Sequence, residues 1–270
     1  MSFELVALKN GLYSLRALDN LETFHPVTGP EAEANILYVK QQRLVERASQ
    51  LGRLVIWDVG LGAAANAVAV LRALRGSAAP VELHSFDSTL APLRFALGNS
   101  MALSYLLEFV PAVEELLARG HVQVGAVHWV LHEGEFGARM ADAPSPDAIN
   151  YDPYSPGSNP EMWTLDHFRL IRARLDRPCL WTNYTRSTSV RVGLLLAGFY
   201  VGYGWAVGEK DQTTAAATEL SLLDWPLERN WLERVKISRN AAPLRAQRVE
   251  DEAISAEDLA ALERHPQFME

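Results

Sequence analysis

Cysteine is nearly absent from this chain of 270 residues, because Cys179 is the only one. A single cysteine excludes an internal disulfide, a zinc site built from several cysteines and a three-cysteine iron–sulfur cluster. Histidine adds no metal site: His128 and His132 lie four apart with no third ligand nearby in sequence, so we interpret them as structural. We therefore expect no metal and no thiol redox chemistry.

Long hydrophobic runs are absent as well. The longest apolar stretches, 63–71 and 192–203, are too short or too interrupted by glycine to span a bilayer. The N-terminus has no basic segment followed by an apolar run, which a secretory signal would need. We expect a cytoplasmic protein without a membrane partner. The sequence carries no signal for an oligomeric state.

Positive charge is in deficit, with a formal net charge of −8. Proteins that depend on phosphate contacts usually have a basic surface, and this chain has none overall. Several arginines do cluster in 169–177. Two interpretations stay open for them: a solvated helix face whose side-chain stems cover apolar surface, or contacts to phosphate.

Strand and helix patterns alternate through the middle of the chain. This alternation predicts an α/β fold, a doubly wound and mostly parallel Rossmann-like sheet. Two later strands at hairpin spacing, 199–206 and 215–223, should end that sheet as an antiparallel pair. The other predicted strands are 54–57, 81–86, 127–131, 148–151 and 179–183, and the predicted helices are 64–74, 89–97, 101–119, 161–175 and 189–197.

Extensions flank this region at both ends. Residues 3–16 alternate around Asn10-Gly11, which predicts a β-hairpin, and a helix should run from Pro30 through Ala48. After Pro226 the composition indicates charged helices at 228–238 and 256–264. We predict an N-terminal extension over 1–29, the main domain over 30–224 and a helical tail over 225–270.

A glycine-rich turn should join the first parallel strand to its helix. Gly60 permits a tight turn, and Gly62 lets a ligand approach the backbone at a helix N-terminus. The pattern Gly60-x-Gly62-x-x-Ala65 fits either a nicotinamide dinucleotide or S-adenosylmethionine.

Three acids at successive strand ends favour the methyl donor. Asp58, just before the first glycine, suits the ammonium of a methionine moiety and would repel a pyrophosphate. Asp87 is placed to accept hydrogen bonds from ribose hydroxyls, and Glu135 falls near the expected adenine edge. Each acid alone also fits a helix N-cap.

The fourth strand end opens the proline-rich stretch 151–163. Asp152 is followed by Pro153, Pro156 and Pro160, which prevent the chain from continuing as strand or helix. A carboxylate there can accept a proton or hydrogen bond from an amine and so free the lone pair that attacks a sulfonium methyl group. Tyr154 could stack on a planar substrate group.

These residues resemble a known motif and a known family. Asp152-Pro-Tyr resembles the Asp-Pro-Pro-Tyr motif of amino-group methyltransferases. Over roughly residues 20–220 the chain resembles the MnmC-like tRNA 5-methylaminomethyl-2-thiouridine methyltransferases, most specifically in 152–156 and 159–164. Supporting matches lie at Gly60 to Asn66, at 86–87, and at Val190-Arg191 with 197–199.

The resemblance implies N-methylation, dependent on S-adenosyl-L-methionine, of an aminomethyl group on the wobble uridine of tRNA. By position, Asp152 and Tyr154 are the catalytic candidates, and Asn66 joins the cofactor-binding set. Candidate substrate contacts are Pro156, Asn159, Trp163, Arg191 and Lys210. Trp163 could instead anchor the loop in the core.

Different functions stay open beside this one. Relatives carry a lysine where this chain has Ser158, and their basic segment is reduced around Lys210, so a small amine-bearing metabolite is an alternative substrate. A nicotinamide oxidoreductase and a non-catalytic binding module also stay open. We expect a single-domain relative without an oxidoreductase domain, because the residues after Pro226 are too few to form one.

Overall fold

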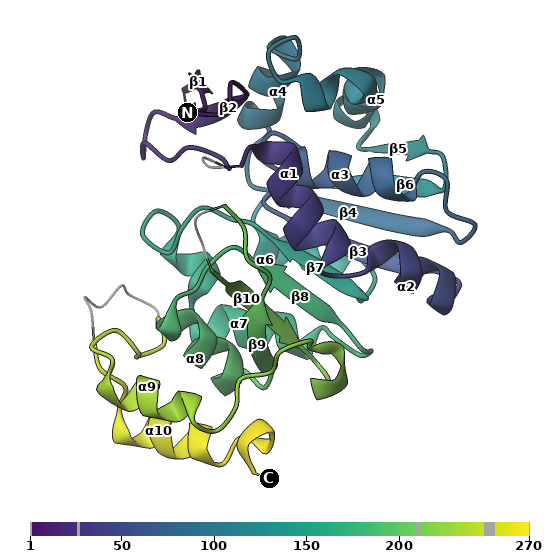
Figure 1. Cartoon of the computed structure of the whole chain (residues 1–270). Helices are drawn as coiled ribbons and strands as arrows, with labels where there is room; N and C mark the ends of the chain where they lie inside the picture. The colour runs from purple at the N-terminus through teal and green to yellow at the C-terminus, as the bar shows by residue number, and fades with distance from the viewer. Residues whose placement is uncertain (1, 26–27, 209–210, 246–251, 270) are drawn as a thin grey trace.

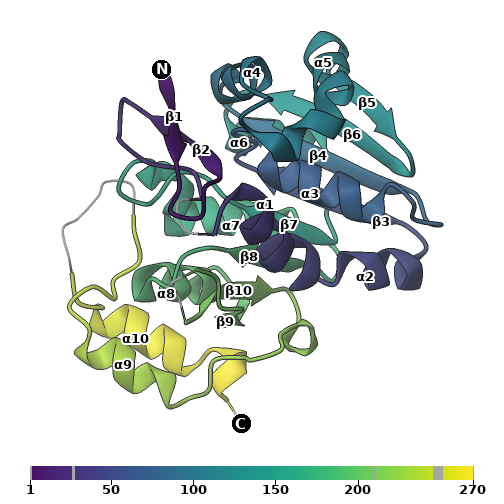
Figure 2. The ribbon, with the colours of Figure 1, turned by 45° about the horizontal axis from the view of Figure 1, so that its top comes forward.

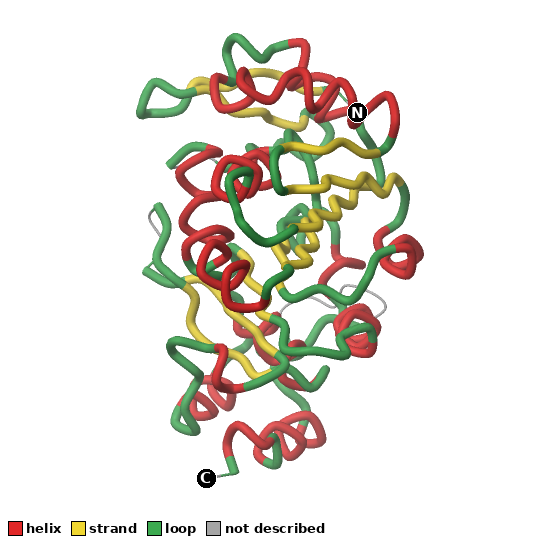
Figure 3. The backbone as a smooth tube through the Cα atoms, turned by 90° about the vertical axis from the view of Figure 1, so that its right-hand side faces the viewer, coloured by secondary structure: helices red, strands yellow, loops and turns green. Residues whose placement is uncertain are grey.

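The computed structural model describes residues 2–25, 28–208, 211–245 and 252–269. Its centre is an eight-stranded sheet of order β5-β6-β4-β3-β7-β8-β10-β9, with helices on both faces (Figures 1 and 3). The strands from β6 to β8 in this order run parallel, whereas β5 at one edge and β10-β9 at the other are antiparallel. The predicted fold class is confirmed. The strands are β3 (Leu54–Val59), β4 (Val81–Asp87), β5 (His121–Val124), β6 (Val127–Glu133), β7 (Ala148–Tyr151), β8 (Leu180–Asn183), β9 (Tyr200–Gly204) and β10 (Thr213–Ala217).

The central strands are buried on both faces. Every residue of β3 and β7 is buried, as near-continuous apolar runs in a covered parallel sheet should be. Ile56 belongs to the core on one side of the sheet, and Trp57 and Val59 belong to the core on the other. The first core is covered by α1 (Pro30–Ala34), α2 (Leu44–Leu51), α3 (Ala65–Leu74), α4 (Ala91–Gly98) and α5 (Val110–Arg119), and the second by α6 (Phe136–Arg139), α7 (Leu165–Ala173) and α8 (Thr188–Leu196).

The predicted helix over 30–48 is wrong as one continuous helix. After α1 the backbone forms a π-helix, η1 (Asn35–Lys40), and Arg43 adopts a left-handed φ of 49° before α2 begins. At this break the side chain of Gln42 reaches the sheet, where its Nε2 donates to Ile149 O at 3.0 Å and to Thr182 Oγ1 at 2.7 Å. A buried amide that reaches strand carbonyls explains why the regular helical hydrogen bonds give way here.

Other boundaries also differ from the sequence prediction. The predicted helix over 101–119 begins as a 3-10 helix, η2 (Ser104–Phe109), and α-helical geometry starts only at α5. The helix expected from 161 is preceded by η4 (Pro160–Trp163), because Thr164 caps α7 by accepting from His167 N. The strand expected over 215–223 ends at Ala217, where η5 (Leu220–Leu222) follows. β5, α6 and η3 (Met140–Asp142) were not predicted.

The flanking segments pack against this layered body (Figure 2). β1 (Phe3–Ala7) and β2 (Tyr13–Ala17) form the predicted antiparallel hairpin, and the Phe3 ring lies 5.9 Å from that of Phe95 in α4. In the tail, α9 (Trp231–Ile237) and α10 (Ala256–Glu263) join the second core, followed by η6 (Pro266–Phe268). The predicted domain boundaries at 29 and 224 stay a prediction.

Candidate active site

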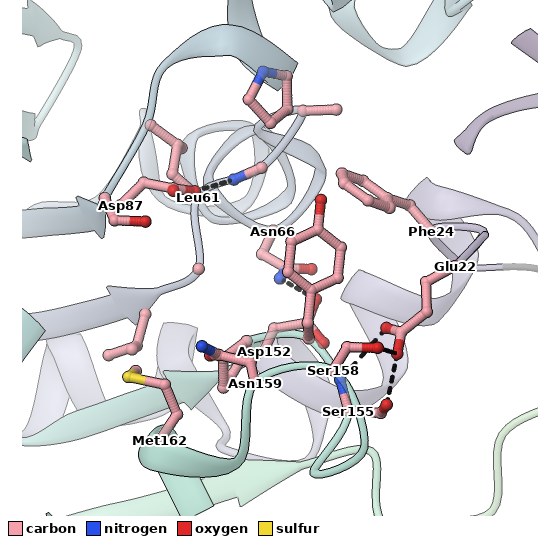
Figure 4. A pocket seen from close by; sticks show the side chains of 18 of the residues that line it. Glu22, Phe24, Leu61, Asn66, Asp87, Asp152, Ser155, Ser158, Asn159 and Met162 are labelled. Atoms are coloured by element: carbon pink, nitrogen blue, oxygen red, sulfur yellow. Dashed lines mark hydrogen bonds between the residues drawn. The ribbon is translucent and has the colours of Figure 1, made fainter. Parts of the chain in front are cut away.

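The carboxyl ends of the parallel strands open into one cavity of about 520 Å³. The loops that follow β3, β4, β6 and β7 supply one side of it, and the segment 20–25 after the N-terminal hairpin supplies the other (Figure 4). Ligands of open α/β sheets bind at this end of the strands. The sheet therefore gathers residues from distant parts of the chain into a single site.

The glycine-rich turn forms the floor of this cavity. Gly60 has a φ of 88°, and a Cβ at this position would lie 2.6 Å from the backbone oxygen of Asp152. The turn after β3 thus presses directly on the end of β7, an approach that only glycine permits. Gly62, with a φ of 52°, donates its N–H to Asp87 Oδ2 at 2.8 Å.

Asp87 is fixed at the end of β4 by backbone donors. Besides Gly62, Thr89 N donates to Asp87 Oδ1 at 3.1 Å. Burial raises the pKa of Asp87, and these backbone hydrogen bonds oppose the rise by stabilising the carboxylate. A carboxylate held in this way retains lone pairs that can accept from ribose hydroxyls of a cofactor on the turn.

Asp152 lies deeper, where the chain leaves β7. Its backbone N–H donates to Val59 O at 2.8 Å, and Asn66 Nδ2 at the start of α3 donates to its Oδ2 at 2.8 Å. Burial raises the pKa of Asp152, against the lowering effects of His25 and Asn66. A partly desolvated carboxylate at a cavity wall is suited to accept a hydrogen bond or a proton from an amine.

The proline-rich loop beyond Asp152 is fixed from beneath by aromatic side chains. Trp163 is 1% exposed, and its Nε1 donates to Tyr154 O at 2.8 Å. Tyr184 OH donates to Pro153 O at 3.0 Å, and the Tyr151 hydroxyl donates to Met162 O. Two of these contacts reach loop carbonyls and the third reaches η4, so they hold the loop where its own backbone forms few regular hydrogen bonds.

The opposite wall is the segment 20–25, which the sequence interpretation missed. Glu22 accepts hydrogen bonds from Ser155 N and from the hydroxyls of Ser155 and Ser158, so it clasps the proline-rich loop (Figure 4). The Phe24 ring lies edge-on to that of Tyr154, with 5.6 Å between centroids. No periodic pattern marks this stretch, because it is a loop whose contacts to the cavity wall are distant in sequence.

The predicted site residues divide into two groups. Those that line the cavity are Gly60, Gly62, Asn66, Asp87, Glu135, Asp152, Tyr154 and Asn159. Asp58, Pro156, Trp163 and Arg191 are not among the lining residues. Lys210 lies outside the residues that the structure describes.

Asp58 is buried in β3, and Arg191 is buried in α8. Asp58 Oδ2 accepts from Ser85 Oγ at 2.7 Å, and burial raises the pKa of Asp58 to about 7. Its other oxygen has no hydrogen-bond partner. Arg191 donates to Thr214 Oγ1 at 3.0 Å and to Thr213 O at 2.8 Å, which ties α8 to β10. The predicted ligand contacts of both residues stay predictions.

The charge of the cavity is almost entirely negative. Among its described lining residues there is no lysine or arginine, and His25 is the one basic group. The acidic lining residues are Glu22, Glu33, Asp87, Glu135, Asp152 and Glu161. Such walls attract a cationic ligand and disfavour an anionic one.

This lining fits S-adenosyl-L-methionine, which carries a sulfonium and an ammonium. The turn at Gly60 and Gly62 gives the close backbone approach, and Asp87 and Glu135 offer acceptors from neighbouring strand ends. Tyr154 adds a buried hydroxyl without a hydrogen-bond partner. Within the described part of the chain, no group of three or more His, Cys, Asp or Glu side chains could hold a metal ion.

Comparison with known proteins agrees with this interpretation. Residues 101–219 match the model of a family described as S-adenosyl-L-methionine-dependent methyltransferases. The chain also aligns with the bifunctional tRNA 5-methylaminomethyl-2-thiouridine biosynthesis protein MnmC of Azoarcus sp., 29% identical over 206 residues, covering 71% of this chain and 32% of that protein. The chain is an S-adenosyl-L-methionine-dependent methyltransferase similar to MnmC.

Further relatives support the same relationship. The methyltransferase is 30% identical over 199 residues to MnmC of Ectopseudomonas mendocina, covering 68% of this chain and 30% of that protein. It spans about a third of the length of these curated relatives. The crystal structure of MnmC2 from Aquifex aeolicus superposes with a TM-score of 0.72 at 27% identity, covering 97% of this chain and 82% of that one. In the described residues, no helix of the methyltransferase has the length and apolar character needed to cross a bilayer.

Proposed function

We propose that this methyltransferase methylates the primary amine of an aminomethyl group on a wobble uridine of tRNA. The observation that carries the proposal is Asp152, a buried carboxylate held by Asn66 at the wall of an acidic cavity. The names of the MnmC relatives point to this nucleoside. A tRNA substrate also implies action in the cytoplasm.

The acceptor amine has to lose a proton before it can react, because an alkylammonium has no free lone pair. S-adenosyl-L-methionine supplies a methyl group on a sulfonium that an amine can displace in line. Asp152 attracts the ammonium, and once a proton has left, its carboxylate accepts an N–H hydrogen bond that turns the lone pair toward the methyl carbon.

Other wall residues position the two ligands. Asp87 and Glu135 would hold the nucleoside part of the cofactor through its hydroxyls and adenine edge, above the Gly60 turn. Tyr154 and Phe24, edge-on to each other near the mouth, offer aromatic faces for a planar base. The hydrogen bonds from Ser155 and Ser158 to Glu22 join the two walls, which narrows access to the cavity and limits water at the reacting atoms.

A small amine-bearing metabolite is the second candidate acceptor. It is favoured by the absence of lysine and arginine from the described cavity lining and by Ser158, which is bonded to Glu22. With this acceptor no phosphate contacts are needed. A tRNA would have to make its phosphate contacts outside the cavity.

Methyl transfer with labelled S-adenosyl-L-methionine tests the proposal. The acceptors are tRNA from a strain that lacks the methyltransferase and, separately, a panel of primary amines. We expect label in the wobble nucleoside, reduced by at least about 10²-fold in Asp152→Asn, because the amine loses the carboxylate that orients it. Asp166→Asn, on the exposed face of α7, is the matched control and should retain the rate. Label in an amine of the panel but not in tRNA would overturn the tRNA substrate.

A further inference from the structure

An imidazole lies between two carboxylates beside the proposed reaction site. His25 Nε2 is 3.7 Å from Asp152 Oδ2, and His25 Nδ1 is 3.7 Å from Glu33 Oε2. All three side chains are largely buried, at 10% exposed for His25 and Glu33 and 15% for Asp152. They come from three separate parts of the chain, namely the segment 20–25, α1 and the end of β7, and all three line the cavity.

Both contacts lie within ion-pair range when the imidazole is protonated. Both separations exceed hydrogen-bond length, so a small shift or a bound amine can complete either contact. Acid–base groups are often loosely spaced before substrate binds and tighten in the reacting complex. Asn66 already donates to Asp152 Oδ2, so the carboxylate has a fixed orientation that does not depend on His25.

We propose that His25 accepts the proton that the substrate ammonium loses, and that Glu33 is a positioning residue for the imidazolium that results. This inference rests on the proposed methylation of an amine and adds the residue that receives its proton. Asp152 then keeps its negative charge and orients the amine. A carboxylate that took the proton itself would lose that charge.

The step balances with no further reactant. One N–H bond of the ammonium breaks, its proton goes to His25 Nε2, and the electron pair stays on nitrogen. That pair forms the N–C bond to the methyl group while the C–S bond breaks, and its electrons remain on sulfur as a neutral thioether. The product is a methylated ammonium, and the imidazolium returns its proton to solvent through the cavity.

The surroundings of His25 stabilise the protonated form of its imidazole. Glu33 and Asp152 face it directly, and Glu22 is near in the same segment. The neighbouring phenols are Tyr38 on η1 and Tyr184 after β8, and burial raises the pKa of both far enough to keep them neutral. Two carboxylates and no lysine or arginine among the described lining residues therefore stabilise a transient imidazolium.

Chemical rescue tests this role. The rate of methyl transfer is measured for wild type, His25→Ala, Glu33→Gln and the exposed control His128→Ala, across pH 5.5–9, with whichever amine the wild-type enzyme methylates. We expect His25→Ala to lose at least about 30-fold in kcat, to recover part of it with added imidazole, and to bind S-adenosylhomocysteine within about twofold of wild type. Glu33→Gln should lose less and displace the acid limb of the pH profile, and His128→Ala should behave as wild type.

Two results would overturn the inference. One is a His25→Ala enzyme with the wild-type rate and pH profile. The other is a loss of rate that imidazole does not restore and that accompanies weaker S-adenosylhomocysteine binding, because that combination marks a structural role. The tRNA proposal is tested separately by the acceptor that the wild-type enzyme methylates. That proposal fails if the enzyme methylates an amine of the panel but not tRNA.

Discussion

Replacement of Gly60 by alanine should disrupt the site more than its single added carbon suggests. The residue has a φ of 88°, which L side chains rarely adopt, and the new Cβ would lie 2.6 Å from Asp152 O, 2.8 Å from Asp152 C and 3.0 Å from Pro153 N. All three are backbone atoms of the chain that carries the proposed catalytic carboxylate. They cannot move aside without shifting Asp152.

The expected loss of stability in Gly60→Ala has two parts. A left-handed conformation costs a non-glycine residue about 1–2 kcal/mol, and overpacking against backbone adds about 1–3 kcal/mol, so we expect about 2–5 kcal/mol of lost stability. Displacement of the turn should also weaken S-adenosylhomocysteine binding at least about tenfold, equivalent to about 1.4 kcal/mol.

Two glycines of this chain separate these parts. Gly52 has a φ of 68°, but a Cβ added there would meet no atom within 4 Å, so Gly52→Ala reports the backbone cost alone. Gly76 has open space and no positive φ, so Gly76→Ala should change stability by no more than about 0.5 kcal/mol. Urea unfolding and calorimetric titration with S-adenosylhomocysteine give both quantities. If Gly60→Ala is no less stable than Gly52→Ala and binds as wild type does, the close approach of the two loops is refuted.

Three further variants test individual contacts. Asp58→Asn tests the buried carboxyl, whose pKa rises from 3.8 to about 7. Between these pH values the unfolded chain has lost a proton that the folded protein keeps, so wild-type stability falls as pH rises. In urea unfolding the variant should gain up to about 4 kcal/mol relative to wild type from pH 4 to pH 8. Parallel stability curves would contradict it. Trp163→Phe removes the donor to Tyr154 O, and it should lower stability by about 1–3 kcal/mol and raise KM for the amine. The control Trp129→Phe loses a hydrogen bond to Ser85 Oγ away from the cavity and should lower stability alone. Equal KM values for the two variants would refute the loop's role. Arg191→Met should cost about 2–4 kcal/mol of stability and leave KM unchanged, and a raised KM at full stability would instead mark a substrate contact.

The predictable parts of the site depend on local chemistry and on sheet geometry. Prolines stop a strand wherever they occur, so the loop after Asp152 could be predicted from its residues. Parallel strands place all their carboxyl ends at one edge, so Asp87, Glu135 and Asp152 could be expected to lie together, and the cavity contains all three.

The orientation of Asp58 could not be predicted in the same way. Every residue of β3 is buried, so the alternation that usually tells one face of a strand from the other is invisible in its sequence. Only the packed sheet shows that Asp58 lies against Ser85 rather than at the cavity wall. The interrupted helix has a similar cause, since Gln42 is held by strand residues more than a hundred positions away.

The sequence by itself thus determined the α/β order of elements, the glycine turn and the acidic strand ends, because these follow from residue types at short spacing. The tertiary structure alone decided which further side chains complete the cavity. It brought His25 to Asp152 and Glu22 and Phe24 to the loop after it, and it placed Trp163 beneath that loop. Such contacts join residues far apart in sequence, and their physical basis is complementary packing and hydrogen bonding that exist only once the chain has folded.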